Sequence, residues 1–134
     1  MPSSNSVTNL TPHEYVDAVK RTESPHFFVD AVNHRILHGA VGCVTESAEL
    51  LDAIKKSLFY GKPLDLVNIQ EELGDLLYYT FLTIDACGGD FEQIIVTNRN
   101  KLAARYGDKF SAESALTRDL TIERDILEKG AAQK

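Results

Sequence analysis

Residues 29–58 read VDAVNHRILHGAVGCVTESAELLDAIKKSL, and this stretch decides the fold class. At 100° per residue, its apolar side chains gather within roughly 60° of one direction, which is the pattern of an amphipathic helix. The residues of this stripe are Val29, Val32, Ile36, Cys43, Leu50, Ile54 and Leu58. Ser24-Pro25 supplies a start and Gly61-Lys62-Pro63 a stop, so we expect one long helix from Ser24 to about Phe59. Gly39 and Gly42 within it indicate the close approach of a neighbouring element or a bend.

The chain on either side of this helix also shows helical patterns. Asp65 can cap a helix that reaches about Cys87. Its apolar stripe consists of Leu66, Ile69, Leu73, Leu77, Thr80 and Ile84. Shorter helices are predicted for residues 11–21, 90–106 and 118–129, the first of them with a capping box that begins at Thr11. No segment alternates apolar and polar residues as a half-buried strand does, so the sequence predicts an all-α bundle with four to five helices per chain.

Composition and charge limit the classes of partner. The chain has 134 residues, a length typical of one domain, and its formal net charge is −6. We expect residues 1–10, rich in Ser, Asn and Thr, to be mobile and residues 11–134 to form a single domain. The acidic balance argues against binding to a nucleic-acid polymer, and no apolar run is long enough to cross a membrane. Cys43 and Cys87 form no CxxC motif and no signal-peptide pattern is present, so a cytoplasmic location is expected.

Four acidic residues on the two long helices are the strongest functional signal. Glu46 and Glu49 are three residues apart, and so are Glu72 and Asp75, so each pair flanks the apolar stripe of its helix. Antiparallel packing of these helices would bring the four carboxylates together, and clustered carboxylates either raise one another's pKa values or require cations. Magnesium fits best, because it takes carboxylate oxygens and keeps waters for a phosphate substrate. A solvated acidic face is the alternative interpretation of each pair taken alone.

A second metal interpretation is a ferritin-like di-iron bundle, which uses Glu-x-x-His pairs. No histidine stands three residues after Glu46, Glu49 or Glu72. His34 and His38 form an i,i+4 pair, but three helical turns, about 16 Å, separate His38 from Glu49. The two histidines also lack further His or Cys ligands at zinc spacing. Packing or hydrogen bonding is the expected role of both, with a place at a substrate pocket as the alternative for His38.

The acidic pairs and their surroundings resemble the MazG-type all-α nucleoside triphosphate pyrophosphohydrolases. That family carries ExxE followed by ExxD, and here 22 residues separate Glu46-x-x-Glu49 from Glu72-x-x-Asp75. The similarity extends to His38-Gly39-Ala40-Val41-Gly42, to Phe59-Tyr60-Gly61-Lys62-Pro63 and to Asn98-x-x-Lys101-Leu102-x-x-Arg105-Tyr106. It covers roughly residues 30–127 and departs from many relatives at Ser47-Ala48, where they carry Ala-Gly.

This resemblance implies a metal-dependent hydrolase that converts a nucleoside triphosphate to the monophosphate and pyrophosphate. It assigns Glu46, Glu49, Glu72 and Asp75 as ligands of two or three Mg²⁺ ions, for which Mn²⁺ can substitute. Glu46 or Glu49 is then the catalytic residue that takes a proton from the attacking water.

The resemblance, supported by helical spacing, also implies a set of substrate-binding residues: His38, Lys56, Tyr79, Asn98, Lys101 and Arg105. Asn98, Lys101 and Arg105 are spaced i, i+3, i+7 and so share one face of a helix that could close over the triphosphate. Tyr79, one turn past Asp75, is similar to the family's aromatic residue at the sugar, and His38 belongs near the base pocket.

A dimer with a shared helical core, which can pair again to a tetramer, is implied as well. The predicted helices support a dimer, because one chain has too few other helices to cover both flanks of the long helix pair. The function we expect is hydrolysis of a deoxynucleoside triphosphate for nucleotide-pool sanitation or adjustment. The alternatives are a non-catalytic dimeric helical interaction module and a di-iron or di-manganese redox bundle. The nucleobase, the sugar and the phosphorus that is attacked are left open.

Overall fold

The computed structural model describes residues 10–132, and the chain divides after Ala31 into two compact units. The first unit contains α1 (Pro12–Thr22) and a short 3₁₀ helix, η1 (Val29–Ala31). α1 begins with the predicted capping box: the Thr11 hydroxyl accepts a hydrogen bond from the Glu14 N–H at 3.3 Å, and the Glu14 carboxylate accepts one from the Thr11 N–H at 2.8 Å. The mobile segment predicted for residues 1–10 lies outside the described residues, except for Leu10.

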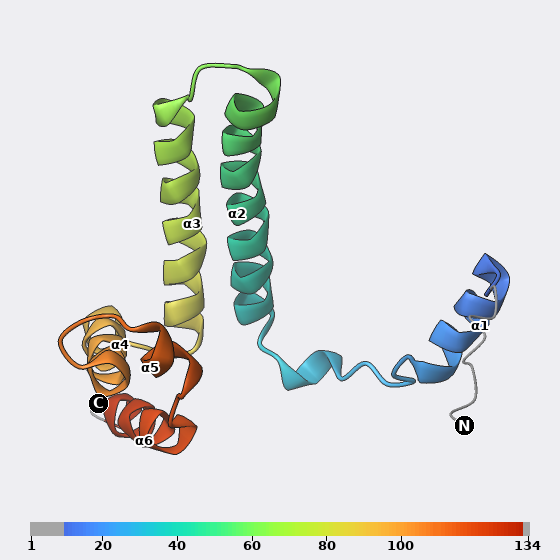
Figure 1. Cartoon of the computed structure of the whole chain (residues 1–134). Coiled ribbons are helices and arrows are strands. Elements are labelled where there is room, and N and C mark those ends of the chain that lie inside the picture. Colours follow the sequence, from blue (N-terminus) through green and yellow to red (C-terminus); the bar gives the residue numbers. More distant parts are fainter. Residues whose placement is uncertain (1–9, 133–134) are drawn as a thin grey trace, which may run out of the picture. The chain divides into compact units, whose positions relative to one another are not determined.

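The second unit consists of five helices (Figure 1): α2 (His34–Tyr60), α3 (Leu66–Ala86), α4 (Phe91–Tyr106), α5 (Ala112–Leu116) and α6 (Leu120–Ala131). Residues 10–132 contain no strand, which confirms the all-α prediction; the five-residue α5 was not among the predicted helices. No helix in this part of the chain is long and apolar enough to cross a membrane. The single domain over residues 11–134 stays a prediction, and every residue predicted for its site lies in the second unit.

The start of the long helix was predicted wrongly: α2 begins at His34 and not near Ser24. The Asn33 side chain accepts a hydrogen bond from the Arg35 N–H at 2.8 Å and so caps the helix there. Upstream, the Ser24 hydroxyl bonds to the backbone of His26, a local turn that competes with helix formation. Val29 therefore matches the helical stripe in sequence but lies outside α2 and is exposed.

α2 and α3 run side by side as an antiparallel hairpin (Figure 1), and small residues bring them close together. Gly39 and Gly42 are buried on α2, and a Cβ atom at these positions would collide with Thr83 and with the Tyr79 ring of α3. Of the two possibilities that the glycines indicated, a close approach or a bend, the structure shows the close approach of α3. Ala53 is the one buried apolar side chain in the described part of the chain, so the hairpin leaves most of its large apolar side chains uncovered.

A buried ion cluster joins α4 to α6. The Glu123 carboxylate is 5% exposed and accepts two hydrogen bonds from the Arg105 guanidinium, at 2.8 and 2.7 Å, and two from the Arg118 guanidinium, at 3.3 and 2.7 Å. The bonds from Arg105 and then those from Arg118 lower the pKa of Glu123 to about 2. The carboxylate is therefore ionised at neutral pH and ties α6 to α4.

Replacing Glu123 with glutamine is expected to lower the melting temperature at pH 7 by about 5–10 °C, because two arginines lose their shared anion. The pKa is lower in the folded state than in the unfolded state, so this stabilisation is present above about pH 4.5 and is lost as the pH falls toward 2. Thermal melts of both proteins between pH 3 and pH 7 should show the difference shrinking on acidification. Glu128→Gln, which alters an exposed pair with Arg124 on the same helix, is the control and should change little. Equal losses in both variants would contradict the prediction.

Candidate metal centre

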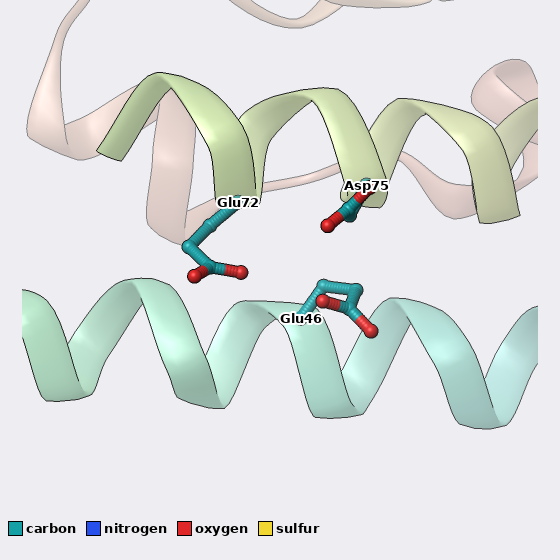
Figure 2. Close-up of side chains that lie close together, drawn as sticks. All are labelled: Glu46, Glu72 and Asp75. Atoms are coloured by element: carbon teal, nitrogen blue, oxygen red, sulfur yellow. The ribbon is translucent and has the colours of Figure 1, made fainter. Parts of the chain in front are cut away.

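Three of the four predicted acids converge between α2 and α3. Glu46 of α2 and Glu72 and Asp75 of α3 each offer one carboxylate oxygen, and these oxygens all lie within 4.8 Å of one another. Figure 2 shows the three side chains directed into the space between the two helices. Glu72 is buried, with 6% exposed, whereas Glu46 is half-buried and Asp75 is exposed. The group is therefore anchored inside the hairpin and open to solvent at one side.

The charge of this group favours a cation. Partial burial raises the pKa of Glu46, and the carboxylates of Glu49, Asp75 and Glu72 raise it further by repulsion. Carboxylate oxygens are hard ligands, and three of them at this separation suit Mg²⁺ or Mn²⁺, which take such oxygens together with waters. The donor set thus fits the metal that the sequence predicts. The group contains no histidine, so within residues 10–132 these acids form no Glu-x-x-His set of the di-iron kind.

Glu49 does not join the converging group. It lies nearly one turn farther along α2 than Glu46, about 60° around the helix, and its side chain is exposed. It is still near enough to act on the pKa of Glu46. The structure therefore places the fourth predicted ligand at the open rim of the site, and its metal contact stays a prediction.

Two hydrogen-bond donors next to the acids were missed by the sequence analysis. The Asn68 amide Nδ2 donates to Glu72 Oε1 at 2.7 Å. The Thr45 hydroxyl lies 3.3 Å from Glu46 Oε1, and it also donates to the Gly42 carbonyl at 3.0 Å. Asn68 precedes Glu72 by four residues on α3 and so shares its face. An amide one turn before a predicted ligand is the signal that would have revealed it.

The aromatic residues predicted for the sugar and the base lie along the same hairpin. Tyr79 is one turn beyond Asp75, and its ring covers Gly42, which is one turn before Glu46. The His38 ring contacts Tyr79 edge-on, with 5.6 Å between ring centroids. Two aromatic rings in contact, those of Tyr79 and His38, therefore lie next to the acidic group. Their contacts with a nucleoside stay predictions.

Lys56 lies on the exposed side of α2 and is paired within the helix. Its ammonium nitrogen is 2.8 Å from Asp52, and Lys55 is 2.9 Å from the same carboxylate. The hydrogen bonds from Lys56 and from Lys55 lower the pKa of Asp52 to about 2. Glu49 also acts on Lys56, so this lysine belongs to the rim of the site.

The face of α4 that was predicted to contact the phosphates is directed toward α6 within this chain. Arg105 is engaged by Glu123, and Asn98 lines a cavity of about 490 Å³ with residues of α6 and of the turn between α3 and α4. Lys101 is half-buried. The structure does not bring these three side chains into the acidic group, and their contacts with phosphate stay predictions.

Comparison with known proteins identifies the family. The family model of the MazG nucleotide pyrophosphohydrolase domain matches residues 40–110, just over half of the chain. The matched region contains Glu46, Glu49, Glu72 and Asp75 and is narrower than the resemblance over residues 30–127, since it leaves out His38 and α6. No significant match was found among curated proteins or among solved structures. With the paired acids, their connection and α4 all inside the match, the chain belongs to the MazG nucleotide pyrophosphohydrolase family.

Proposed function

We propose that this protein is a metal-dependent hydrolase that converts a deoxynucleoside triphosphate to the monophosphate and pyrophosphate. The observation that supports this most is the convergence of Glu46, Glu72 and Asp75 inside the region that matches a pyrophosphohydrolase family. The biological role that fits is sanitation or adjustment of the nucleotide pool. The two free cysteines, Cys43 and Cys87, suit the cytoplasm as its location.

The charge of the chain makes a metal necessary for this reaction. A protein of net charge −6 whose site is a group of carboxylates repels a triphosphate unless cations lie between them. Glu46, Glu72 and Asp75 would hold Mg²⁺ or Mn²⁺, with Glu49 completing the ligands for two or three ions. When bound, such ions neutralise phosphate charge and lower the pKa of a water nucleophile.

The remaining roles fall to side chains around the acids. Glu46 or Glu49 would accept the proton of the attacking water. Lys56 can exchange Asp52 for a phosphate oxygen at little cost, because both partners of that ion pair are half exposed.

The other proposed substrate contacts are Tyr79 at the sugar, His38 near the base, and Asn98, Lys101 and Arg105 at the phosphates. Arg105 would reach a phosphate only by giving up or sharing its contact with Glu123.

A second copy of the chain would cover the apolar flank of the hairpin. Leu37, Val44, Leu51 and Leu58 recur every seven residues on α2 and are all exposed. On α3, the predicted stripe residues Leu66, Leu73 and Leu77 are exposed as well. These two sets of exposed residues form one apolar row on each helix. Both apolar rows lie on one side of the antiparallel hairpin, and Glu49 and Asp75 lie on the opposite side. We therefore propose a dimer with a shared helical core, which can pair again to a tetramer, and no nucleic-acid or membrane partner.

The test is a product analysis with Mg²⁺ and a panel of normal and modified nucleoside triphosphates, in which monophosphate, pyrophosphate and orthophosphate are measured separately. We expect monophosphate and pyrophosphate in equal amounts, and turnover rates that differ among the bases and sugars of the panel. Both products should be lost when a chelator is added. Monophosphate accompanied by orthophosphate alone, in a preparation free of pyrophosphatase, would instead indicate stepwise removal of phosphates.

The alternative is a helical interaction module whose acids only keep it soluble. Its exposed apolar rows are equally suited to assembly without catalysis. Such a module would turn over no nucleotide at any Mg²⁺ or Mn²⁺ concentration and would bind neither metal. That pair of results would overturn the proposed function.

A further inference from the structure

Glu72 is the buried member of the acidic group, and a neutral amide holds one of its oxygens. Asn68 Nδ2 donates to Glu72 Oε1 at 2.7 Å, across one turn of α3. From this contact we infer that Asn68 is a positioning residue, which fixes the Glu72 carboxylate in the orientation that a divalent cation requires. The inference rests on the proposed function, because it concerns a ligand of that same metal.

The Glu72 carboxylate needs such a donor more than its neighbours do. It is 6% exposed, so little water is available to solvate it, and oxygens of Glu46 and Asp75 lie within 4.8 Å. Without a donor, a buried carboxylate among like charges would turn away from the group. Exposed Asp75 can be solvated directly, whereas Glu72 depends on groups of the protein.

The kind of donor also matters. A lysine or arginine at this place would neutralise Glu72 and compete with the cation for the same carboxylate. An amide carries no net charge, so it orients the oxygen and leaves the full negative charge of Glu72 for the metal. Partners of this kind around metal ligands typically account for 10–100-fold in affinity.

The position of Asn68 in the helix allows its role to be tested apart from folding. Asn68 is the third residue of α3, and its backbone N–H is satisfied by the Asp65 carboxylate at 3.1 Å. The cap therefore uses the Asp65 side chain and the Asn68 backbone, and not the Asn68 amide. Leucine has a similar size, favours helices and lacks the donor, while glutamine keeps an amide that can still reach one turn along.

The experiment measures binding of Mn²⁺ alone to the full chain, by the electron paramagnetic resonance signal of free Mn²⁺, without nucleotide. Asn68→Leu is expected to weaken Mn²⁺ binding about 10–100-fold, and Asn68→Gln to restore it to within about 5-fold of wild type. Metal-free melting curves should show that wild type and both variants are folded at the temperature of the binding measurement. Asn100→Leu, at an exposed asparagine on α4, is the matched control and should bind Mn²⁺ as wild type does.

Each outcome separates this inference from the proposed function. If wild type binds Mn²⁺ and Asn68→Leu binds it equally well, Asn68 does not position Glu72, and the proposed function stands. A lower metal-free melting temperature with unchanged Mn²⁺ affinity would show that the contact only stabilises the helix. If wild type binds no Mn²⁺, the proposed metal site itself fails. For a positioning role, the variant should also need more Mg²⁺ for half-maximal turnover, with a maximal rate at saturating Mg²⁺ close to that of wild type.

Discussion

Replacing Glu72 with glutamine is expected to reduce pyrophosphate release by at least about 100-fold. The substitution keeps the size of the side chain and the acceptor for Asn68, but it removes a charge from the buried member of the acidic group. A metal held by Glu46, Glu72 and Asp75 would lose one of its anionic ligands. Initial rates at several Mg²⁺ concentrations, with Mn²⁺ binding measured in parallel, would show whether activity and metal affinity fall together.

Glu71→Gln is the matched control, because the same change is made one residue away. Glu71 is exposed and lies 100° around α3 from Glu72, outside the converging group. It should retain wild-type rates and Mn²⁺ affinity. Equal losses in both variants would indicate a general effect of lowering the negative charge and would remove the special role of Glu72.

The metal-free stability of Glu72→Gln tests the electrostatic argument independently of catalysis. Loss of one of three neighbouring carboxylate charges relieves repulsion, so the melting temperature without metal should stay level or rise. Added Mg²⁺ should stabilise wild type by linkage and the variant much less. An interaction module would also gain stability from the substitution, but it would show no Mg²⁺-dependent difference between the two proteins.

Much of the fold could be predicted because most helix boundaries are set by local capping and stop residues. The capping box at Thr11, the Asp65 cap and the stop at Gly61, whose φ of 66° suits glycine, all lie where the sequence places them. The start of α2 was missed because Val29 and Val32 extend the apolar period beyond the helix. Apolar period alone does not show where a cap interrupts it, and here the cap is Asn33.

The acidic site was predictable in its members but not in its geometry. Spacing of three residues puts each pair of acids on one side of its helix, and it identified all three residues that converge. It could not distinguish Glu46, which is directed at α3, from Glu49 at the rim, because that difference depends on how the two helices are rotated against each other. The Asn68 and Thr45 donors were missed because an uncharged polar residue on a helix becomes informative only when its spacing from a predicted ligand is considered, as for Asn68, one turn before Glu72.

The apolar stripe of α3 shows a further limit of helical periodicity. Leu73 and Leu77 belong to the same predicted stripe as Thr80 and Ile84, yet in the single chain the two leucines are exposed, while Thr80 and Ile84 are half-buried against neighbouring elements. A helical wheel shows which residues avoid water, but it does not show whether the cover comes from the same chain or from another copy. The exposed rows are thus the part of the pattern that a single chain does not use.

Replacing Leu51 with glutamate is expected to convert the proposed dimer to a monomer at micromolar concentration. Leu51 is 65% exposed on α2, in the middle of the row that recurs every seven residues. In a monomer, glutamate at an exposed helical position costs little. In a symmetric dimer the same change is present twice, and each copy would bury an unpaired charge in an apolar interface. The dissociation constant should therefore rise more than about 100-fold, which sedimentation velocity across a dilution series would detect.

Val67→Glu provides the comparison, because Val67 is 79% exposed on α3 but points about 80° or more away from the row formed by Leu66, Leu73 and Leu77. It should sediment as wild type does. Since Glu46, Glu72 and Asp75 all come from one chain, the Leu51→Glu monomer should still bind Mn²⁺. Loss of turnover with retained Mn²⁺ binding would mean that the partner subunit completes the substrate pocket and not the metal site. A wild-type protein that is monomeric at every concentration would rule out the proposed dimer. If wild type is a dimer and Leu51→Glu sediments in the same way, the dimer interface lies elsewhere.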